Sequence, residues 1–174
     1  MHFRKTKLDG VYIVELQKIS DSRGFFARAW CGDEQRHAGL AMEVAQCNIS
    51  NNQKKWTLRG MHYQVDPYAE IKFVRCIRGA IYDVVLDLRK ASPTYLKWIG
   101  VELSAANRNA LYIPQGFAHG YQTLVDDSEI FYQVSEPYNP ASEGGVRWND
   151  PVFGIQWPQV SAPIISEKDR TWPD

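Results

Sequence analysis

The chain has 174 residues, enough for one well-buried core and too few for two ordinary domains. Lysine plus arginine and aspartate plus glutamate number 20 each, so the formal net charge is zero and no diffuse positive field exists to attract nucleic acid. Neither a secretory leader nor a run of eighteen apolar residues is found, so we expect no membrane partner.

Strand-like segments, separated by glycine and proline turns, follow one another along the chain. In chain order we expect them at about 11–17, 56–65, 71–78, 80–88, 96–103, 109–113 and 129–135. The stretch from Val11 to Arg28 alternates like an edge strand. Many short strands with turns between them predict an all-β sandwich or barrel, formed as a single domain by residues 1–174.

Helices are expected in two short places only. Residues 33–39 have a helical pattern, with Asp33 as a possible cap and Gly39 as the stop, and a second short helix is possible after Ser166. Within the strand at 80–88, one face is apolar or aromatic, whereas the residues Ile81, Asp83, Val85 and Asp87 give a mixed face.

Cysteine usage indicates a reducing compartment. The three cysteines, Cys31, Cys47 and Cys76, cannot form a complete disulfide framework, and their spacing matches no zinc motif. We therefore expect a cytoplasmic location. Cys76 lies inside a strand pattern, which favours a small buried apolar residue over a reactive thiol.

The segment TLRGMHYQVDPYAEIKF, residues 57–73, carries most of the candidate chemistry. It places Arg59, His62 and Lys72 on consecutive strand-like segments. An imidazole is a base near neutral pH, and the two cations can hold an anionic substrate and a developing negative charge. A lone strand histidine is more often structural, but here His119 and two tyrosines accompany the set. We interpret this set of residues as a catalytic site that abstracts a proton beside a carbonyl group of a phosphorylated substrate.

Six motifs occur along the chain in this order: DSRGFFAR, LRGMHYQ, DLRKASPTY, IPQGFAHG, GGVRWNDP and SEKD. Their order and spacing, from about Leu8 to Asp169, resemble the dTDP-4-dehydrorhamnose 3,5-epimerase family. The resemblance implies a cupin-type jelly-roll β-barrel whose open end holds a nucleotide-diphospho-4-keto-6-deoxy-hexose, by default dTDP-4-dehydro-6-deoxy-D-glucose. It implies epimerisation at C3, C5 or both, and a homodimer in which an N-terminal segment completes the neighbour's site.

The resemblance also implies roles for the catalytic residues. The histidine matching His62 removes the protons at C3 and C5, and the aspartate matching Asp169 orients its ring. Lys72, with His119 as a neighbouring donor, matches the group that stabilises the enolate oxygen at C4. Tyr132 matches the proton donor on the opposite face of the sugar. Taken alone, Asp169 would be a surface charge or helix cap and Tyr132 a core aromatic.

Substrate-binding roles follow from the same resemblance. Arg23 and Arg59 match residues at the diphosphate, which a guanidinium group binds in a bidentate manner. Tyr138 matches a residue that stacks on the nucleotide base. The other matches to ligand-binding positions are Gln46, Asn48, Glu143 and Lys168.

Two positions depart from the family's pattern. Arg28 replaces the usual glutamate, and Gln133 replaces a lysine after the catalytic tyrosine. Thymine presents an N3–H donor, and a guanidinium facing it would leave a buried donor unsatisfied at a cost of about 1–3 kcal/mol. One hypothesis is therefore a CDP-linked substrate. The alternative is that Arg28 swings outward or contacts phosphate, leaving dTDP preferred.

The implied cupin fold makes a metal site one of the alternatives to consider. Many cupins bind iron, manganese or zinc through a His-x-His pair, a carboxylate and a later histidine. The later half is present as Pro114-x-Gly116-x-x-His119, but His62 is followed by Tyr63 and Gln64, so the paired imidazole is missing. We expect no metal and no cofactor. The rival hypotheses are a metal-dependent cupin oxygenase and a non-catalytic sugar-binding cupin.

Overall fold

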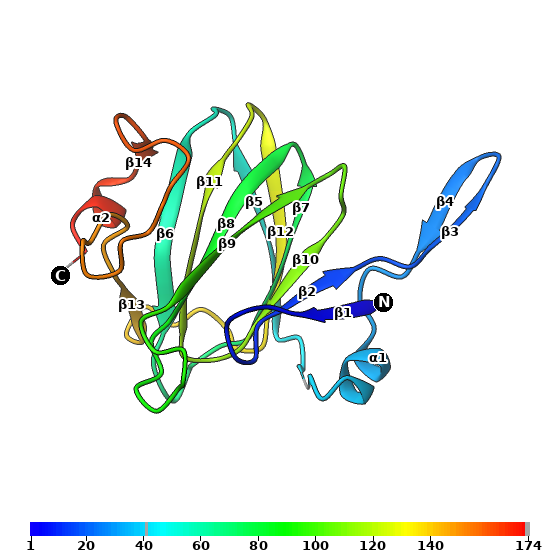
Figure 1. The fold of residues 1–174 in the computed structure, drawn as a ribbon, viewed down its shortest axis with the longest axis horizontal. Helices are drawn as coiled ribbons and strands as arrows, with labels where there is room; N and C mark the ends of the chain where they lie inside the picture. The colour runs from blue at the N-terminus through cyan, green and yellow to red at the C-terminus, as the bar shows by residue number, and fades with distance from the viewer. Residues whose placement is uncertain (41, 173–174) are drawn as a thin grey trace.

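Two largely antiparallel sheets face each other and enclose the main core (Figure 1). The computed structural model describes residues 1–40 and 42–172. The first sheet has the order β1 (His2–Lys5), β2 (Tyr12–Glu15), β10 (Ala110–Ile113), β7 (Lys72–Arg78), β12 (Ser128–Val134) and β5 (Gln46–Asn52). The second has the order β13 (Glu143–Gly145), β6 (Thr57–Gln64), β11 (Phe117–Thr123), β8 (Ala80–Asp87) and β9 (Trp98–Ser104), with β14 (Ile164–Ile165) parallel to β6.

The all-β prediction is confirmed, and so are the two short helices. The helix α1 (Gly32–His37) lies where residues 33–39 predicted it, and α2 (Glu167–Arg170) follows Ser166. The prediction of Asp33 as the cap is wrong: Cys31 is the N-cap, without a capping side-chain hydrogen bond, and Asp33 lies in the first turn. An acidic residue there is favourable because it complements the helix dipole.

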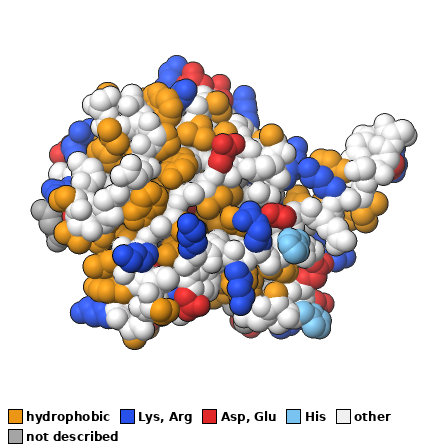
Figure 2. Space-filling view, viewed as in Figure 1, with side chains coloured by type: hydrophobic (Ala, Val, Ile, Leu, Met, Phe, Trp, Pro, Cys, Tyr) orange, Lys and Arg blue, Asp and Glu red, His pale blue; other side chains and the backbone are white. Residues whose placement is uncertain are grey.

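The N-terminal segment differs from the single edge strand that its alternation predicted. β2 lies between β1 and β10, so it is an inner strand of the first sheet. The chain then leaves the barrel as a separate hairpin, β3 (Lys18–Asp21) and β4 (Gly24–Ala27). This hairpin stands clear of the body (Figures 1 and 2). Alternation did not predict the break because it continues through the hairpin.

The two faces of β8 are both buried, against different layers. Val84 and Leu86, on the apolar face, pack under an outer layer that contains Trp148 and Trp157. The mixed face points into the barrel, where Ile81 and Val85 join the main core and Asp83 is fully buried. The polar residues of this face are therefore inside the barrel, where they can serve a site.

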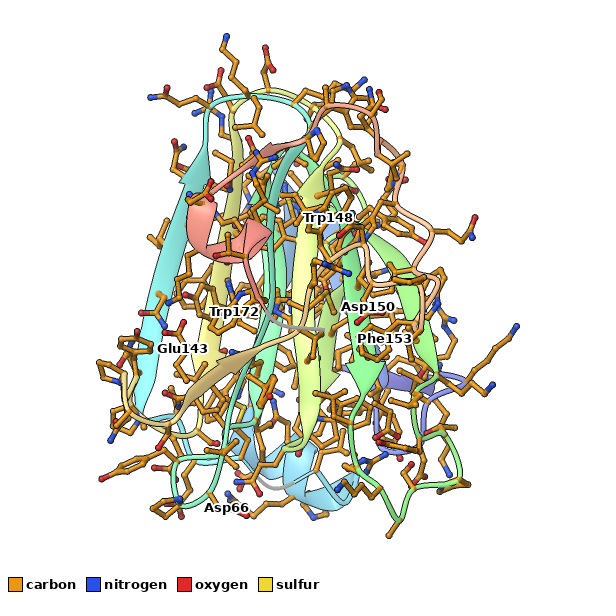
Figure 3. The ribbon with its side chains drawn as sticks, turned by 90° about the vertical axis from the view of Figure 1, so that its left-hand side faces the viewer. Asp66, Glu143, Trp148, Asp150, Phe153 and Trp172 are labelled. Carbon is orange, nitrogen blue, oxygen red and sulfur yellow. The ribbon has the colours of Figure 1, made fainter. Side chains whose placement is uncertain are left out.

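The outer layer also brings the C-terminal part of the chain back to β6. It covers the second sheet with residues that include Trp148 and Phe153 (Figure 3). The indole Nε1 of Trp157 donates a hydrogen bond to the carbonyl oxygen of Trp148 at 2.8 Å. From this layer the chain enters β14 and then α2, which places Asp169 beside β6.

The interpretation of Cys76 is confirmed. It lies in β7 with 1% of its surface exposed, and burial raises the pKa of its thiol to about 11. In the described part of the chain, no helix has the length and apolar character needed to cross a membrane.

Candidate active site

A β-bulge in β6 places Arg59 and His62, both in the motif LRGMHYQ, on one face of the strand. His62 and Arg59 are three residues apart, so strict alternation would point them in opposite directions. On β11, however, their partners are His119 and Tyr121, which are two apart, so β6 holds one extra residue. Gly60 makes this possible: its φ is +133°, and a Cβ there would meet the Cα of Gly120 at 2.5 Å.

His62 and Asp169 form a hydrogen-bonded pair. The His62 Nε2 lies 2.6 Å from the Asp169 Oδ1, and the Gly60 amide donates to the other carboxylate oxygen at 3.3 Å. The Ser166 Oγ accepts from the Asp169 amide at 3.1 Å, which caps α2 and fixes the aspartate. An Nε2–H that donates to Asp169 leaves Nδ1 as the basic nitrogen.

The carboxylate of Asp169 is charged at neutral pH. Burial alone would raise its pKa, but the hydrogen bond and charge of His62, with the Gly60 and Ser166 hydrogen bonds, hold it below the ordinary value. A buried anion in this position can orient the imidazole and stabilise it after it takes up a proton.

Two cavities meet at the catalytic candidates. An outer cavity of about 340 Å³ and an inner cavity of about 170 Å³ are both lined by His62, Lys72 and Tyr132. These three come from β6, β7 and β12, so both sheets contribute. The structure therefore brings all four predicted catalytic residues to one place, because Asp169 lies directly behind His62.

Tyr132 is suited to donate a proton. Burial raises the pKa of its phenol, and the negative charge of Glu70 raises it further, against the opposing effect of Arg59. The hydroxyl group therefore stays protonated at neutral pH. It lies in the other sheet from His62, so the two side chains enter the cavities from different sheets.

A second histidine–aspartate pair is formed by His119, which lines the inner cavity, and the fully buried Asp83. The His119 Nε2 lies 2.9 Å and 3.0 Å from the two carboxylate oxygens of Asp83. Burial raises the pKa of Asp83, while the charge and hydrogen bond of His119 lower it in part. Arg59 lines the same cavity and donates from Nε to the Asn52 side-chain oxygen at 2.8 Å.

The outer cavity is lined by five of the ten predicted substrate-binding residues: Gln46, Asn48, Lys72, Tyr138 and Glu143. Gln46 and Asn48 enter it from β5 and hydrogen-bond to each other at 2.7 Å. The Tyr138 hydroxyl donates to the Glu143 carboxylate at 2.8 Å, and the Lys168 ammonium pairs with the same carboxylate. Figure 3 shows Glu143 on β13, at this end of the barrel.

Two predicted binding residues lie elsewhere. Arg23 is at the tip of the hairpin, where its side chain is 88% exposed and pairs with Asp21 at 2.6 Å. Arg28 pairs with Glu34 of α1. The hairpin is on the opposite side of the molecule from α2 (Figure 1), so neither arginine reaches the cavities of its own chain.

Sequence reasoning missed three residues of this site: Glu70, Asp83 and Trp172. Trp172 packs edge-on against His62, with ring centroids 6.2 Å apart at 69°. Its ring fills the space where a Cβ of Gly145 would be, and Gly145 is the β13 partner of His62. Figure 3 shows Trp172 close to β13 and α2. The glycine pair in GGVRWNDP was the one available signal, because it permits this close approach.

Among the described residues, no group of three or more histidine, cysteine, aspartate or glutamate side chains is arranged to hold a metal ion. The two histidines of the site are each hydrogen-bonded to a different aspartate.

Fold and site together define a class: a cupin-type barrel enzyme whose interior brings a histidine, a lysine and a tyrosine together at the junction of two cavities. Comparison with known proteins gives the family. A family model described as dTDP-4-dehydrorhamnose 3,5-epimerase matches residues 5–174. The chain belongs to this family of sugar epimerases, and the fold prediction of a cupin-type jelly roll is confirmed.

Individual relatives are similar to this chain over nearly its full length. The dTDP-4-dehydrorhamnose 3,5-epimerase of Methanothermobacter thermautotrophicus is 44% identical over 98% of this chain and 92% of its own. The dTDP-4-dehydrorhamnose 3-epimerase of Streptomyces niveus is 36% identical over 98% of this chain and 82% of its own. A crystal structure of the 3,5-epimerase from Bacillus anthracis, with TDP and PPi bound, has a TM-score of 0.95 at 40% identity, covering 99% of this chain and 98% of that one.

Proposed function

We propose that the chain epimerises a dTDP-linked 4-keto-6-deoxy-hexose at C3, C5 or both, with His62 as the base. The observation that carries the proposal is the His62–Asp169 pair, which faces Lys72 and Tyr132 across the junction of two cavities. Family membership supports the reaction class.

The reaction follows from the acidity of protons beside a carbonyl. His62 takes the proton from C3, and the electron pair of the broken C–H bond moves to the C4 oxygen as an enolate. The ammonium of Lys72 stabilises this charge, because it already lies in the cavity where the charge develops. Tyr132 then delivers a proton to the opposite face of the carbon. Repeating the cycle at C5 gives the double epimer, and a single cycle gives the C3 epimer.

We propose that the nucleotide and diphosphate occupy the outer cavity and its surroundings. Tyr138 offers an exposed ring for the base, Lys168 offers a cation for phosphate beside the outer cavity, and Arg59 offers a second cation from the adjoining inner cavity. The thymidine nucleotide in the Bacillus anthracis relative favours dTDP. The names of the relatives include both a 3,5-epimerase and a 3-epimerase, so both outcomes occur in close homologues.

The nucleotide preference is tested by offering dTDP- and CDP-linked 4-keto-6-deoxy-D-glucose and following the products by proton NMR. We expect dTDP to be preferred, because the Arg28 guanidinium is engaged by Glu34 and does not oppose the thymine N3–H. Arg28→Ala should leave that preference unchanged. A native preference for CDP would contradict the assignment, and reversal in Arg28→Ala would show that Arg28 reads the base.

A homodimer of the full chain, residues 1–174, is proposed, in the cytoplasm, where the three free cysteines stay reduced. The hairpin supports the dimer. It projects from the barrel and exposes Ile19 at 70% and Phe26 at 71%, which is apolar surface suited to a partner. We propose that it covers the neighbour's outer cavity and presents Arg23 to the neighbour's ligand.

Sedimentation analysis should therefore give twice the 20.0 kDa mass of the chain. Phe26→Asp should shift the protein toward monomer and lower activity, because a buried unpaired charge opposes the interface. Arg23→Ala should remain dimeric and raise the substrate KM, whereas Arg36→Ala, at another exposed arginine that lies on α1, should change neither. A 20.0 kDa species with full activity at high dilution is the contradicting result.

A further inference from the structure

A buried acidic side chain without an assigned role lies beside the catalytic residues. Glu70 lies two residues before the first residue of β7, and its side chain is 9% exposed. It forms an ion pair with Lys72, whose side chain is 12% exposed. Both line the outer cavity together with His62 and Tyr132. A buried carboxylate is costly unless it is paired, so the two charges are held as a unit.

The proposed role of Lys72, stabilisation of the enolate, requires that its ammonium group be held in a fixed position. A lysine side chain has a flexible four-carbon stem that ends in a compact charge. An enolate is stabilised best by a cation that already lies where the negative charge develops. We propose that Glu70 is a positioning residue of the epimerase, whose carboxylate holds the Lys72 ammonium at the junction of the two cavities, where the C4 oxygen of the sugar becomes charged. This inference rests on the proposed function.

The same carboxylate also acts on the proton donor. Burial is the first cause of the raised pKa of Tyr132, and the charge of Glu70 is the second. Keeping this phenol protonated preserves it as an acid up to higher pH. The other titratable groups that line the cavities with Tyr132 are Arg59, His62 and Tyr63 of β6, Lys72 of β7, His119 and Tyr121 of β11, Glu143 of β13, and Tyr138, which follows β12.

Two variants separate the negative charge of the Glu70 carboxylate from its ability to accept a hydrogen bond. Glu70→Gln keeps an acceptor oxygen for the Lys72 ammonium but removes the negative charge, whereas Glu70→Ala removes both. We expect kcat to fall about 10²-fold in Glu70→Ala, on the scale that misplacement of a catalytic group costs, and less in Glu70→Gln. KM should change little in both. Glu129→Gln, on β12 and hydrogen-bonded to Asn51 outside the cavities, is the matched control and should behave as native.

The pH profile supplies a readout that a merely structural role would not move. Removing a negative charge beside Tyr132 lowers the pKa of its phenol, so the alkaline limb of kcat should move to lower pH in both Glu70 variants. The phenol can also be titrated without turnover, through the tyrosine Cζ resonance that Tyr132→Phe removes from the carbon-13 NMR spectrum. In Glu70→Gln this resonance should titrate at lower pH than in the native protein.

Native kcat in a folded Glu70→Ala, or an unmoved Tyr132 titration in Glu70→Gln, would overturn the proposal. If Glu70→Ala fails to fold, the Glu70→Gln titration decides alone. Because that titration needs no substrate, it distinguishes failure of this inference from failure of the proposed function, which would appear as an inactive native protein.

Discussion

Replacing His62 with Asn is expected to abolish epimerisation and solvent exchange together. His62 lines both cavities and therefore lies at their junction, whereas His119, the other histidine of the site with an aspartate partner, lines the inner cavity alone. A general base contributes on the order of 10²–10⁴-fold, so kcat/KM should fall by at least that range. Initial rates with dTDP-4-keto-6-deoxy-D-glucose, with deuterium incorporation from D₂O, measure both losses.

His37→Asn is the matched control. His37 lies on α1, where its Nδ1 contacts the backbone oxygen of Asp33, and it is exposed. This variant should retain native rates. Undiminished deuterium incorporation in His62→Asn would remove His62 from the role of base.

Replacing Tyr132 with Phe should separate two events that the native enzyme couples. His62 and Lys72 remain, so proton abstraction and exchange with solvent continue, but the protonated phenol that would deliver hydrogen to the opposite face is gone. Inversion should fall by about 10²-fold or more, while some exchange with retained configuration persists. Product stereochemistry and deuterium content, read from the same NMR spectra, give the two rates separately.

Tyr95→Phe, a partly exposed tyrosine outside the cavities, should match the native enzyme in both rates. Equal losses of exchange and inversion in Tyr132→Phe would instead mean that Tyr132 binds or supports the substrate without donating the proton.

Period-two patterns predicted the barrel strands because each buries one face against a core, but they could not predict local breaks in that period. The bulge at Gly60 puts Arg59 and His62 on one face, although their spacing alone predicts opposite faces. In the same way, alternation from Val11 to Arg28 concealed the turn into a projecting hairpin. Where the alternation is interrupted because two strand backbones approach closely, the only trace in the sequence is the glycine that permits the approach.

Long-range partners were available only through the family resemblance. Asp169 is 107 residues from His62 and would be a surface charge by its local sequence. Glu70 and Trp172 were missed because their roles depend on what they touch: Lys72 for one, His62 for the other. A charged residue in a turn and an aromatic residue near a terminus are ordinary features until packing brings them to a cavity.

The most direct test of metal-free proton abstraction at this site is position-resolved deuterium incorporation after exhaustive dialysis against a chelator. The dialysed native protein, given dTDP-4-keto-6-deoxy-D-glucose in D₂O, should exchange the proton at C3, and at C5 if both centres invert, at its undialysed rate. The dialysed His62→Asn protein should exchange neither. Loss of exchange on dialysis, restored by adding back a metal ion, would contradict the account.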